Sequence, residues 1–406
     1  MNYLDWAATT PPDSAIALQA LNASCDHFAN PSSQHRAGKA AREILEGSRA
    51  SFLESLALAS GVKSLGGNLA FTASGTEADQ IPLLSLFRLA KKAESGTGTT
   101  RPSATDKPHL VISAIEHAAI DAQAETLSRL GFAVSFVKPG ADGIVQPSKI
   151  GAALRPATKL VAVMAVNNET GAVQDTDAIG SAVASAASSL GIRTPLFHVD
   201  CVQALGKVPL SLSGGRVTSA AFSAHKIQGP KGVGALWHSK AIDPLAVGGG
   251  QESGIRSGTE NLFGIYAFAL CAAKAAASLD ARLPRARALE RLLLDGILAI
   301  PGACVVPRSR VAGDPRWSPW IVSASFPGLG GEVLARALSD ADIAVSTGSA
   351  CSHTHKTKGR RILEAMGLPE ELSFSSIRVS FGPDTAEADI EAFLSTAEAL
   401  YRRLKT

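Results

Sequence analysis

Short apolar runs alternate with amphipathic stretches between about residues 65 and 240. Few positions in these runs are charged, which is typical of strands buried on both faces of a sheet. Several of the intervening stretches are long enough to form crossover helices. The alternation therefore predicts an α/β fold with a mostly parallel central sheet wrapped by helices. The expected strands span 69–71, 110–113, 133–137, 160–166, 196–199, 219–222 and 233–237, and the expected helices span 77–92, 118–130 and 177–190.

The pattern changes after the glycine run at 248–250. An Ala/Leu-rich helical stretch over about 261–298, which Pro284 can interrupt, leads into a smaller α+β unit. We expect a large domain over 13–260 and a small domain made of 1–12 together with 261–406. Strands of the small unit are expected at 303–306, 321–326 and 377–380, and helices at 331–338 and 387–404.

The composition excludes several classes of protein. Apolar residues make up 46% of the chain and charged residues 18%, which argues against a disordered or coiled-coil protein. The 39 basic and 36 acidic residues nearly balance, so neither nucleic acid nor an acidic membrane surface is an expected partner. The sequence shows neither a membrane-spanning apolar run nor the pattern of a secretory signal. We therefore expect a cytoplasmic protein that acts on small molecules.

Polar side chains follow two predicted strands that are about one connection apart. Lys226 follows the strand at 219–222 and precedes a Gly/Pro turn, and a lysine of lowered pKa can form a Schiff base with an aldehyde. Asp200 ends the strand at 196–199, where a carboxylate can pair with the protonated ring nitrogen of pyridoxal phosphate. The alternatives are a solvated lysine and a helix N-cap. Together the two residues favour a cofactor site where the strands end.

The segment 71–79, FTASGTEAD, joins a predicted strand to a predicted helix through Ser-Gly-Thr. Gly75 and Thr76 would then lie at a helix N-terminus, where backbone N–H groups and a hydroxyl can bind phosphate. The alternative is an ordinary capped helix. The chain has no G-x-x-x-x-G-K-[ST] motif and no G-x-G-x-x-G that opens a helix here, so a nucleotide-linked oxidoreductase is disfavoured.

Further motifs accompany these segments in a fixed order: YLDWAATT, NPSSQH, FTASGTEAD, EH, VNNETG, HVDCVQ, SAHKIQGPKGVG, GIRSGT, TGSAC and SIRVSFG. Taken together they resemble the pyridoxal-phosphate-dependent cysteine desulfurases of the NifS/IscS kind, within the class V aminotransferase family. The resemblance covers nearly the whole chain. It implies a fold type I transferase that forms a homodimer, with pyridoxal 5'-phosphate as cofactor and L-cysteine as substrate.

The resemblance also implies roles for individual residues. Lys226 matches the lysine that binds the cofactor, and His117 matches the residue that stacks on its ring. Arg378 and Asn168 match groups that hold the substrate, a guanidinium being suited to a bidentate grip on a carboxylate. Cys351 matches the nucleophile that takes the substrate sulfur. Asp200 matches the partner of the ring nitrogen, Gln203 a donor to the phenolic oxygen, Thr76, Ser223 and His225 the phosphate binders with Gly75, and Thr259 a phosphate contact made across the dimer interface.

Cys351 differs from the other cysteines in its surroundings. It precedes the polar, cationic stretch SHTHKTK, where nearby positive charge favours the thiolate, whereas the others are expected to be small buried thiols. His353 and His355 could ligate a zinc ion with Cys351, although donors this close on a loop more often face water, and no metal is expected. Relatives usually have small residues and Glu-Pro-Ser at this point, so the departure leaves the sulfur acceptor open.

The expected activity is therefore the removal of sulfur from L-cysteine, giving L-alanine and a persulfide on Cys351. The persulfide would pass to an iron-sulfur scaffold or a sulfur-carrier protein. The alternatives are a selenocysteine lyase, another class V reaction, or a sulfur-relay platform without turnover. The Ser/Thr/Gly-rich stretch at 94–107 is expected to be a mobile surface loop.

Overall fold

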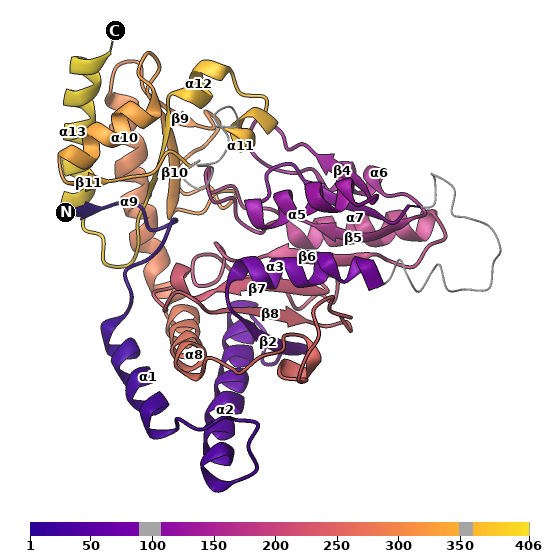
Figure 1. Cartoon of the computed structure of the whole chain (residues 1–406). Coiled ribbons are helices and arrows are strands. Elements are labelled where there is room, and N and C mark those ends of the chain that lie inside the picture. Colours follow the sequence, from indigo (N-terminus) through magenta and orange to yellow (C-terminus); the bar gives the residue numbers. More distant parts are fainter. Residues whose placement is uncertain (89–106, 349–359, 406) are drawn as a thin grey trace.

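The computed structural model describes residues 1–88, 107–348 and 360–405, so nearly all of the predicted loop at 94–107 lies outside the described residues. Its centre is a seven-stranded sheet in the order β2-β8-β7-β6-β5-β3-β4 (Figure 1). The two pairs that β8 makes are antiparallel, and the other pairs of this sheet are parallel. This confirms the predicted mostly parallel sheet. The strands are β2 (Asn68–Thr72), β3 (His109–Ser113), β4 (Ala133–Val137), β5 (Thr158–Ala162), β6 (Leu196–Asp200), β7 (Ser219–Ser223) and β8 (Gly234–His238).

Helices cover both faces of this sheet because successive side chains of a strand point to opposite faces. In β3, Val111 packs into the core that α2 and α7 also enter, whereas Leu110 and Ile112 pack with α3 and α5. One face carries α2 (Arg36–Ala59), α6 (Pro147–Ala153), α7 (Thr176–Ser189) and α8 (Leu262–Ala277), and the other carries α3 (Gly75–Leu84) and α5 (Ala118–Arg129). Helix α1 (Ser14–Asp26) lies along α8.

Strand β4 departs from the expectation that every strand is buried on both faces. It is an edge strand that pairs only with β3 in this sheet, and Phe136 is 45% exposed. A run of apolar residues does not reveal which strand ends at the edge, because strand order depends on pairing between distant segments.

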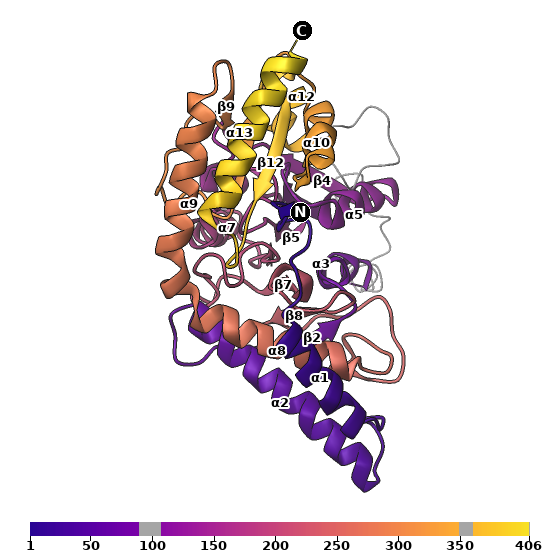
Figure 2. The same ribbon diagram turned by 90° about the vertical axis from the view of Figure 1, so that its left-hand side faces the viewer.

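The second unit contains a three-stranded antiparallel sheet in the order β12-β10-β9, packed against α9, α10 and α13 (Figure 2). The first residues of the chain join this unit, because β1 (Asn2–Tyr3) pairs in parallel with β11 (Ile343–Ala344). The other elements are α9 (Leu279–Ala299), β9 (Cys304–Val306), β10 (Ile321–Ser325), α10 (Gly331–Asp340), α11 (Arg361–Ala365), α12 (Glu370–Phe374), β12 (Ser376–Ser380) and α13 (Glu387–Leu404).

The long helical stretch breaks at Ser278 and not near Pro284, which lies inside α9. The hydroxyl of Ser278 donates a hydrogen bond to the carbonyl of Lys274 at 2.6 Å and closes the end of α8, and α9 then leaves at a bend of 71°. Such a side-chain bond to the backbone competes with helix continuation. Helix α8 packs in the core of the large sheet and the second core begins in α9, so the predicted division at residue 260 stays a prediction.

Among the helices that the structure describes, no single helix is both long and apolar enough to cross a bilayer. Helices α8 and α9 reach the required length and composition only when they are counted together across their bend.

Candidate active site

A cavity of about 380 Å³ lies where the parallel strands of the large sheet end and the second unit begins. It collects most of the side chains that the sequence singled out. Those that line it are Gly75, Thr76, His117, Asn168, Asp200, Gln203, Ser223, His225, Lys226 and Arg378. Thr259 is exposed and is not among the lining residues in the described part of the chain.

The ends of β6 and β7 place two of these groups side by side. The strands are parallel neighbours in which Asp200 pairs with Ala221, and the short 3-10 helix η1 (Ala224–Lys226) follows β7 directly. Parallel strands end at the same edge of a sheet, so the side chains that follow them meet there. This confirms the expectation that the two strand ends are neighbours.

Lys226 is half-buried and bonded within the protein, so the alternative of a solvated lysine is wrong. Its ammonium donates hydrogen bonds to the carbonyls of Ala7 and Ala8, at 2.7 Å and 2.8 Å. These carbonyls belong to the N-terminal segment, which crosses from the second unit to the sheet. The amine is therefore held at the cavity wall by backbone acceptors.

Asp200 is 4% exposed, and one of its oxygens accepts a hydrogen bond from the backbone N–H of Val202 at 2.8 Å. Burial and, to a lesser extent, repulsion from the neighbouring acid Asp79 raise the pKa of its carboxyl to about 8. A buried carboxyl of this kind regains its charge when a cation is placed beside it. Asp200 therefore makes a turn contact and also offers a cation partner to the cavity.

The start of α3 forms a narrow cradle at the cavity. Ser74 caps the helix, its hydroxyl accepting a hydrogen bond from the N–H of Glu77 at 3.1 Å. A Cβ at Gly75 would lie 2.9 Å from a methyl of Val202 and 3.1 Å from the Cβ of Ser223, so a side chain there would force its neighbours apart. The backbone N–H groups stay close to the cavity, which suits an anion such as phosphate.

His117 and His225 are both neutral at pH 7. Burial and, to a lesser extent, the positive charge of Lys226 lower the pKa of each imidazole to about 4. His117 caps α5, with Nδ1 accepting from the N–H of Ala119 at 3.2 Å. Nδ1 of His225 lies 3.2 Å from the hydroxyl of Thr9. Both rings are therefore uncharged and held in place.

Arg378 reaches the cavity from β12, and its side chain is buried, with 5% of the residue exposed. Its Nη1 donates to the carbonyl of Asn168 at 2.9 Å, and its Nη2 donates to Oδ1 of Asp5 at 2.8 Å. Its buried Nε finds no hydrogen-bond partner among the residues that the structure describes, and the same is true of Oδ1 of Asn168 and Oε2 of Glu116. Buried polar atoms are rarely left unpaired, so these atoms indicate a polar ligand.

Some residues at this site carried no predicted role. Asp79 is 1% exposed and shares a hydrogen bond of 3.1 Å between its Oδ1 and Nε2 of His198, and burial raises its pKa well above the usual range. Helical spacing could have indicated that Asp79 is buried, because the buried positions of α3 include 78, 79, 82 and 83. Arg361 also lines the cavity and donates to the carbonyl of Ala114 at 2.7 Å. Asp5 gave no local signal, since its partner Arg378 is 373 residues away.

Cys351, His353 and His355 lie outside the described residues. Gly348 and Arg361, which stand on either side of them in the chain, both line the cavity.

Of the remaining cysteines, Cys201 and Cys271 are buried, as expected, and burial raises the pKa of both thiols. Cys25 is exposed on α1, contrary to the expectation of a buried thiol. Helix spacing alone did not place it, because α1 buries only Ala20.

Comparison with known proteins places the chain in a family. The model of the family described as aminotransferase class-V matches residues 2–393. A protein named cysteine desulfurase IscS from Shewanella piezotolerans is 34% identical over 403 residues, which is 97% of this chain and 91% of the relative. The protein of that name from Pseudomonas entomophila is 35% identical over 398 residues, 96% of this chain and 90% of the relative.

Solved structures agree with this result. A NifS-like protein superposes with a TM-score of 0.83 at 30% identity, covering 99% of both chains. The NifS-like protein from Rickettsia africae superposes with a TM-score of 0.79 at 28% identity, covering 98% of this chain and 99% of that one. The predicted fold class is therefore confirmed.

Pyridoxal phosphate is the cofactor of such enzymes, and the residues present fit it. The cavity offers an amine at Lys226, a buried acid at Asp200 and a glycine-lined cradle at Gly75. The unpaired atoms of Arg378 and Asn168 provide contacts for a polar ligand beside these groups. On its sequence, its fold and this site, the chain belongs to the aminotransferase class-V family of pyridoxal-phosphate-dependent enzymes.

Proposed function

We propose that this chain is a cysteine desulfurase that converts L-cysteine to L-alanine and carries the sulfur as a persulfide on Cys351. One observation carries the proposal: Lys226, Asp200, His117 and Arg378 line a single cavity, and residues on either side of Cys351 in the chain line it too. The names of the similar proteins, cysteine desulfurase IscS, support this reaction over others of the family.

The cofactor, when bound, supplies an electron sink for the substrate's α-carbon. Lys226 would hold the cofactor through its aldehyde, and its amine is the group that would move the proton at that carbon. Asp200 would pair with the protonated ring nitrogen, and the neutral imidazole of His117 would contact the ring. Arg378 binds the substrate carboxylate through the N–H groups that other residues leave available.

Cys351 performs the sulfur step. Its thiolate attacks the substrate sulfur, so that an S–S bond forms, the C–S bond breaks and its electron pair stays on carbon. A proton then adds to that carbon, and alanine leaves. Asn168 lies beside Arg378 and would help to orient the substrate.

The remaining contacts to the cofactor come from Gln203 and from the phosphate cradle. Gln203 would donate to the phenolic oxygen, and Thr76, Ser223 and His225 with the backbone at Gly75 would bind the phosphate. Thr259, exposed in a single chain, would complete the phosphate site across the interface of a homodimer. An iron-sulfur scaffold or sulfur-carrier protein in the cytoplasm would accept the persulfide.

The proposal is tested by incubating purified protein with L-cysteine and a thiol reductant. We expect alanine and sulfide in equal amounts from the natural chain. Cys351→Ala should retain the cofactor and lose at least about 10²-fold in sulfide release, because the nucleophile is removed. Cys25→Ala, at an exposed position on α1, is the matched control and should keep full activity.

Two results would contradict the proposal. A keto acid in place of alanine would indicate transamination or a lyase reaction. Loss of the cofactor from Cys351→Ala would assign Cys351 to cofactor binding and not to sulfur transfer.

A further inference from the structure

The side-chain amide of Gln203 is held in one orientation by two different neighbours. Gln203 is 4% exposed, and its Oε1 accepts a hydrogen bond from the ammonium of Lys207 at 2.6 Å. Its Nε2 donates to the carbonyl of Ala7 at 2.9 Å. An ammonium only donates and a carbonyl only accepts, so this pair fixes which end of the amide is nitrogen.

The nitrogen end of this amide lies on the Lys226 side. The carbonyl oxygen of Ala7 also accepts from Nζ of Lys226 at 2.7 Å, so both nitrogens are bonded to one oxygen. Gln203 and Lys226 line the same cavity of about 380 Å³. Nε2 carries a second N–H, which is available to a ligand of that cavity.

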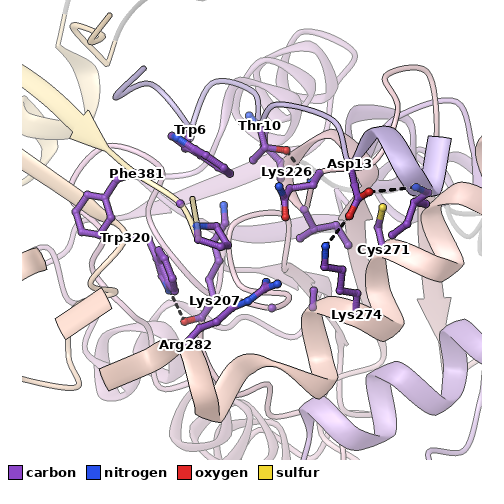
Figure 3. Close-up of a pocket in the computed structure, with 17 residues that line it drawn as sticks. Trp6, Thr10, Asp13, Lys207, Lys226, Cys271, Lys274, Arg282, Trp320 and Phe381 are labelled. Carbon is purple, nitrogen blue, oxygen red and sulfur yellow. Dashed lines mark hydrogen bonds and ion pairs between the residues drawn. The ribbon is translucent and has the colours of Figure 1, made fainter. Parts of the chain in front are cut away.

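Lys207 reaches Gln203 from behind this wall. It lines a separate cavity of about 40 Å³ together with Lys226, Trp6 and Trp320 (Figure 3). The indole N–H of Trp320 donates to the backbone carbonyl of Lys207 at 3.0 Å and holds this segment against the second unit. An ammonium that is removed from water is costly unless it is hydrogen-bonded, and its bond to Gln203 supplies a partner.

Positive groups surround this ammonium. Burial and, to a lesser extent, the positive charges of Lys226 and Arg378 lower the pKa of Lys207 to about 7. Arg282 lines the same small cavity, while Asp13 across it is bonded to Lys274 at 2.6 Å. A lysine in this position gains little from ion pairing, so its hydrogen bond to Gln203 is the contact that accounts for its place.

We propose that Lys207 is a positioning residue, which acts through Gln203 and keeps the amide nitrogen directed at the cofactor. The proposal rests on the function proposed above, in which Gln203 donates to the phenolic oxygen of pyridoxal phosphate. Without Lys207, the amide can rotate so that Oε1 of Gln203 faces the phenolic oxygen in place of Nε2. The phenolic oxygen then loses its hydrogen-bond donor and faces a second acceptor.

The holoenzyme provides readouts that do not depend on turnover. In Lys207→Met, which keeps the length of the side chain but lacks the donor, we expect the pH midpoint of the cofactor's visible absorption to rise by about one unit. A phenolic oxygen that loses a donor holds its proton more tightly, because the donor stabilises its charged form. A hydrogen bond to a charged group changes the acid dissociation constant by about tenfold or more, which is about one pH unit. Release of the cofactor should be faster by about the same factor.

Lys274→Met is the matched control, because Lys274 lines the same small cavity but bonds Asp13. It should leave the midpoint and the release rate unchanged. Gln203→Leu should reproduce the shift of Lys207→Met, and the double variant should match Gln203→Leu alone, because a residue that acts through another adds nothing once that other is gone.

Unchanged spectra in Lys207→Met, or shifts that add in the double variant, would overturn the positioning role. If Lys207→Met does not fold, Lys207→Leu is measured in its place with the same expected result. A natural chain that takes up no pyridoxal phosphate would overturn the proposed function itself, which distinguishes the two failures.

Discussion

Asp200 shows how the surroundings set the chemistry of a single residue at this site. Its carboxyl is buried beside a second buried acid, Asp79, which in turn contacts His198. Burial, followed by repulsion from Asp79, raises the pKa of Asp200 to about 8. Without a cation beside it, the carboxyl is mainly protonated at neutral pH, and a protonated ring nitrogen would restore its charge.

The raised pKa of Asp200 predicts a pH-dependent stability for the cofactor-free chain. The carboxyl binds its proton more tightly when folded, with a pKa of about 8 against 3.8, so the stability that it contributes is lost as pH rises through this window. The loss is about 1.4 kcal/mol per pH unit. The pH slope of denaturant unfolding between pH 5 and pH 7 should be smaller by this amount in Asp200→Asn, because other buried acids such as Asp79 keep their own contributions. Asp26→Asn, at an exposed position, should leave the slope unchanged.

Substitution of Arg378 is expected to weaken substrate binding without unfolding the chain. Lys keeps the charge but not the planar fork, so Arg378→Lys should raise KM for L-cysteine by about 10²-fold while the cofactor stays bound. Steady-state kinetics measure the effect, and Arg316→Lys at an exposed ion pair is the control. An unchanged KM would show that the guanidinium serves only its bonds to Asp5 and Asn168.

At the scale of elements, strand β8 determines the position of the turn at Gly75, which we propose as the phosphate site. Gly234 begins β8 directly beneath the turn that opens α3. A Cβ at this position would clash with the backbone carbon of Ser74 and would lie 2.7 Å from the backbone nitrogen of Gly75. Backbone atoms cannot rotate away as a side chain can, so any side chain on the strand must displace the start of the helix.

We therefore expect Gly234→Ala to weaken cofactor binding. Displacement that costs one backbone hydrogen bond to the phosphate corresponds to about a tenfold loss of affinity. Fluorescence titration with pyridoxal phosphate measures it. Gly47→Ala is the control, because a Cβ there meets nothing within 4 Å and the change in α2 should stabilise the chain by about 0.5–1 kcal/mol. Equal affinity in the two variants would contradict the role of β8.

At the scale of the whole molecule, the cavity exists because the second unit is fastened to the end of the sheet. Arg310 makes part of this junction: its side chain is fully buried, pairs with Glu290 of α9 at 2.8 Å and donates to the carbonyl of Thr170 at 2.9 Å. The N–H of Ser318 donates to the carbonyl of Gly171 at 2.8 Å. These bonds hold the turn that carries Asn168 against the second unit.

Arg310→Met should destabilise the chain by about 3 kcal/mol, because it leaves Glu290 buried with one partner fewer. The value lies at the low end for a broken buried pair, since Arg287 still bonds Glu290 at 2.8 Å. Urea unfolding measures the loss, and Arg310→Met combined with Glu290→Leu should recover much of it. A loss that is no smaller in the double variant would argue against an uncompensated charge as the cause.

The sequence by itself determined the fold class and the approximate positions of the strands of the sheet. It also predicted Lys226, Asp200 and the Gly75 turn as site residues, and these residues line one cavity. These predictions follow from local features, namely burial periodicity, strand-end position and helix capping, which depend on neighbours close in the chain. It did not place the break at Ser278, because that depends on a serine hydroxyl bonding the backbone of α8.

Only the tertiary structure decided the contacts between distant segments. In the folded chain Asp5 bonds Arg378. Lys207 and the carbonyl of Ala7 fix the orientation of the Gln203 amide. Strand β4 lies at the edge of the large sheet. Such contacts carry no periodic signal, because they depend on strand order and on the docking of the N-terminal segment. The sequence therefore indicates which residue types line the site, whereas the orientation of their side chains depends on how remote segments pack.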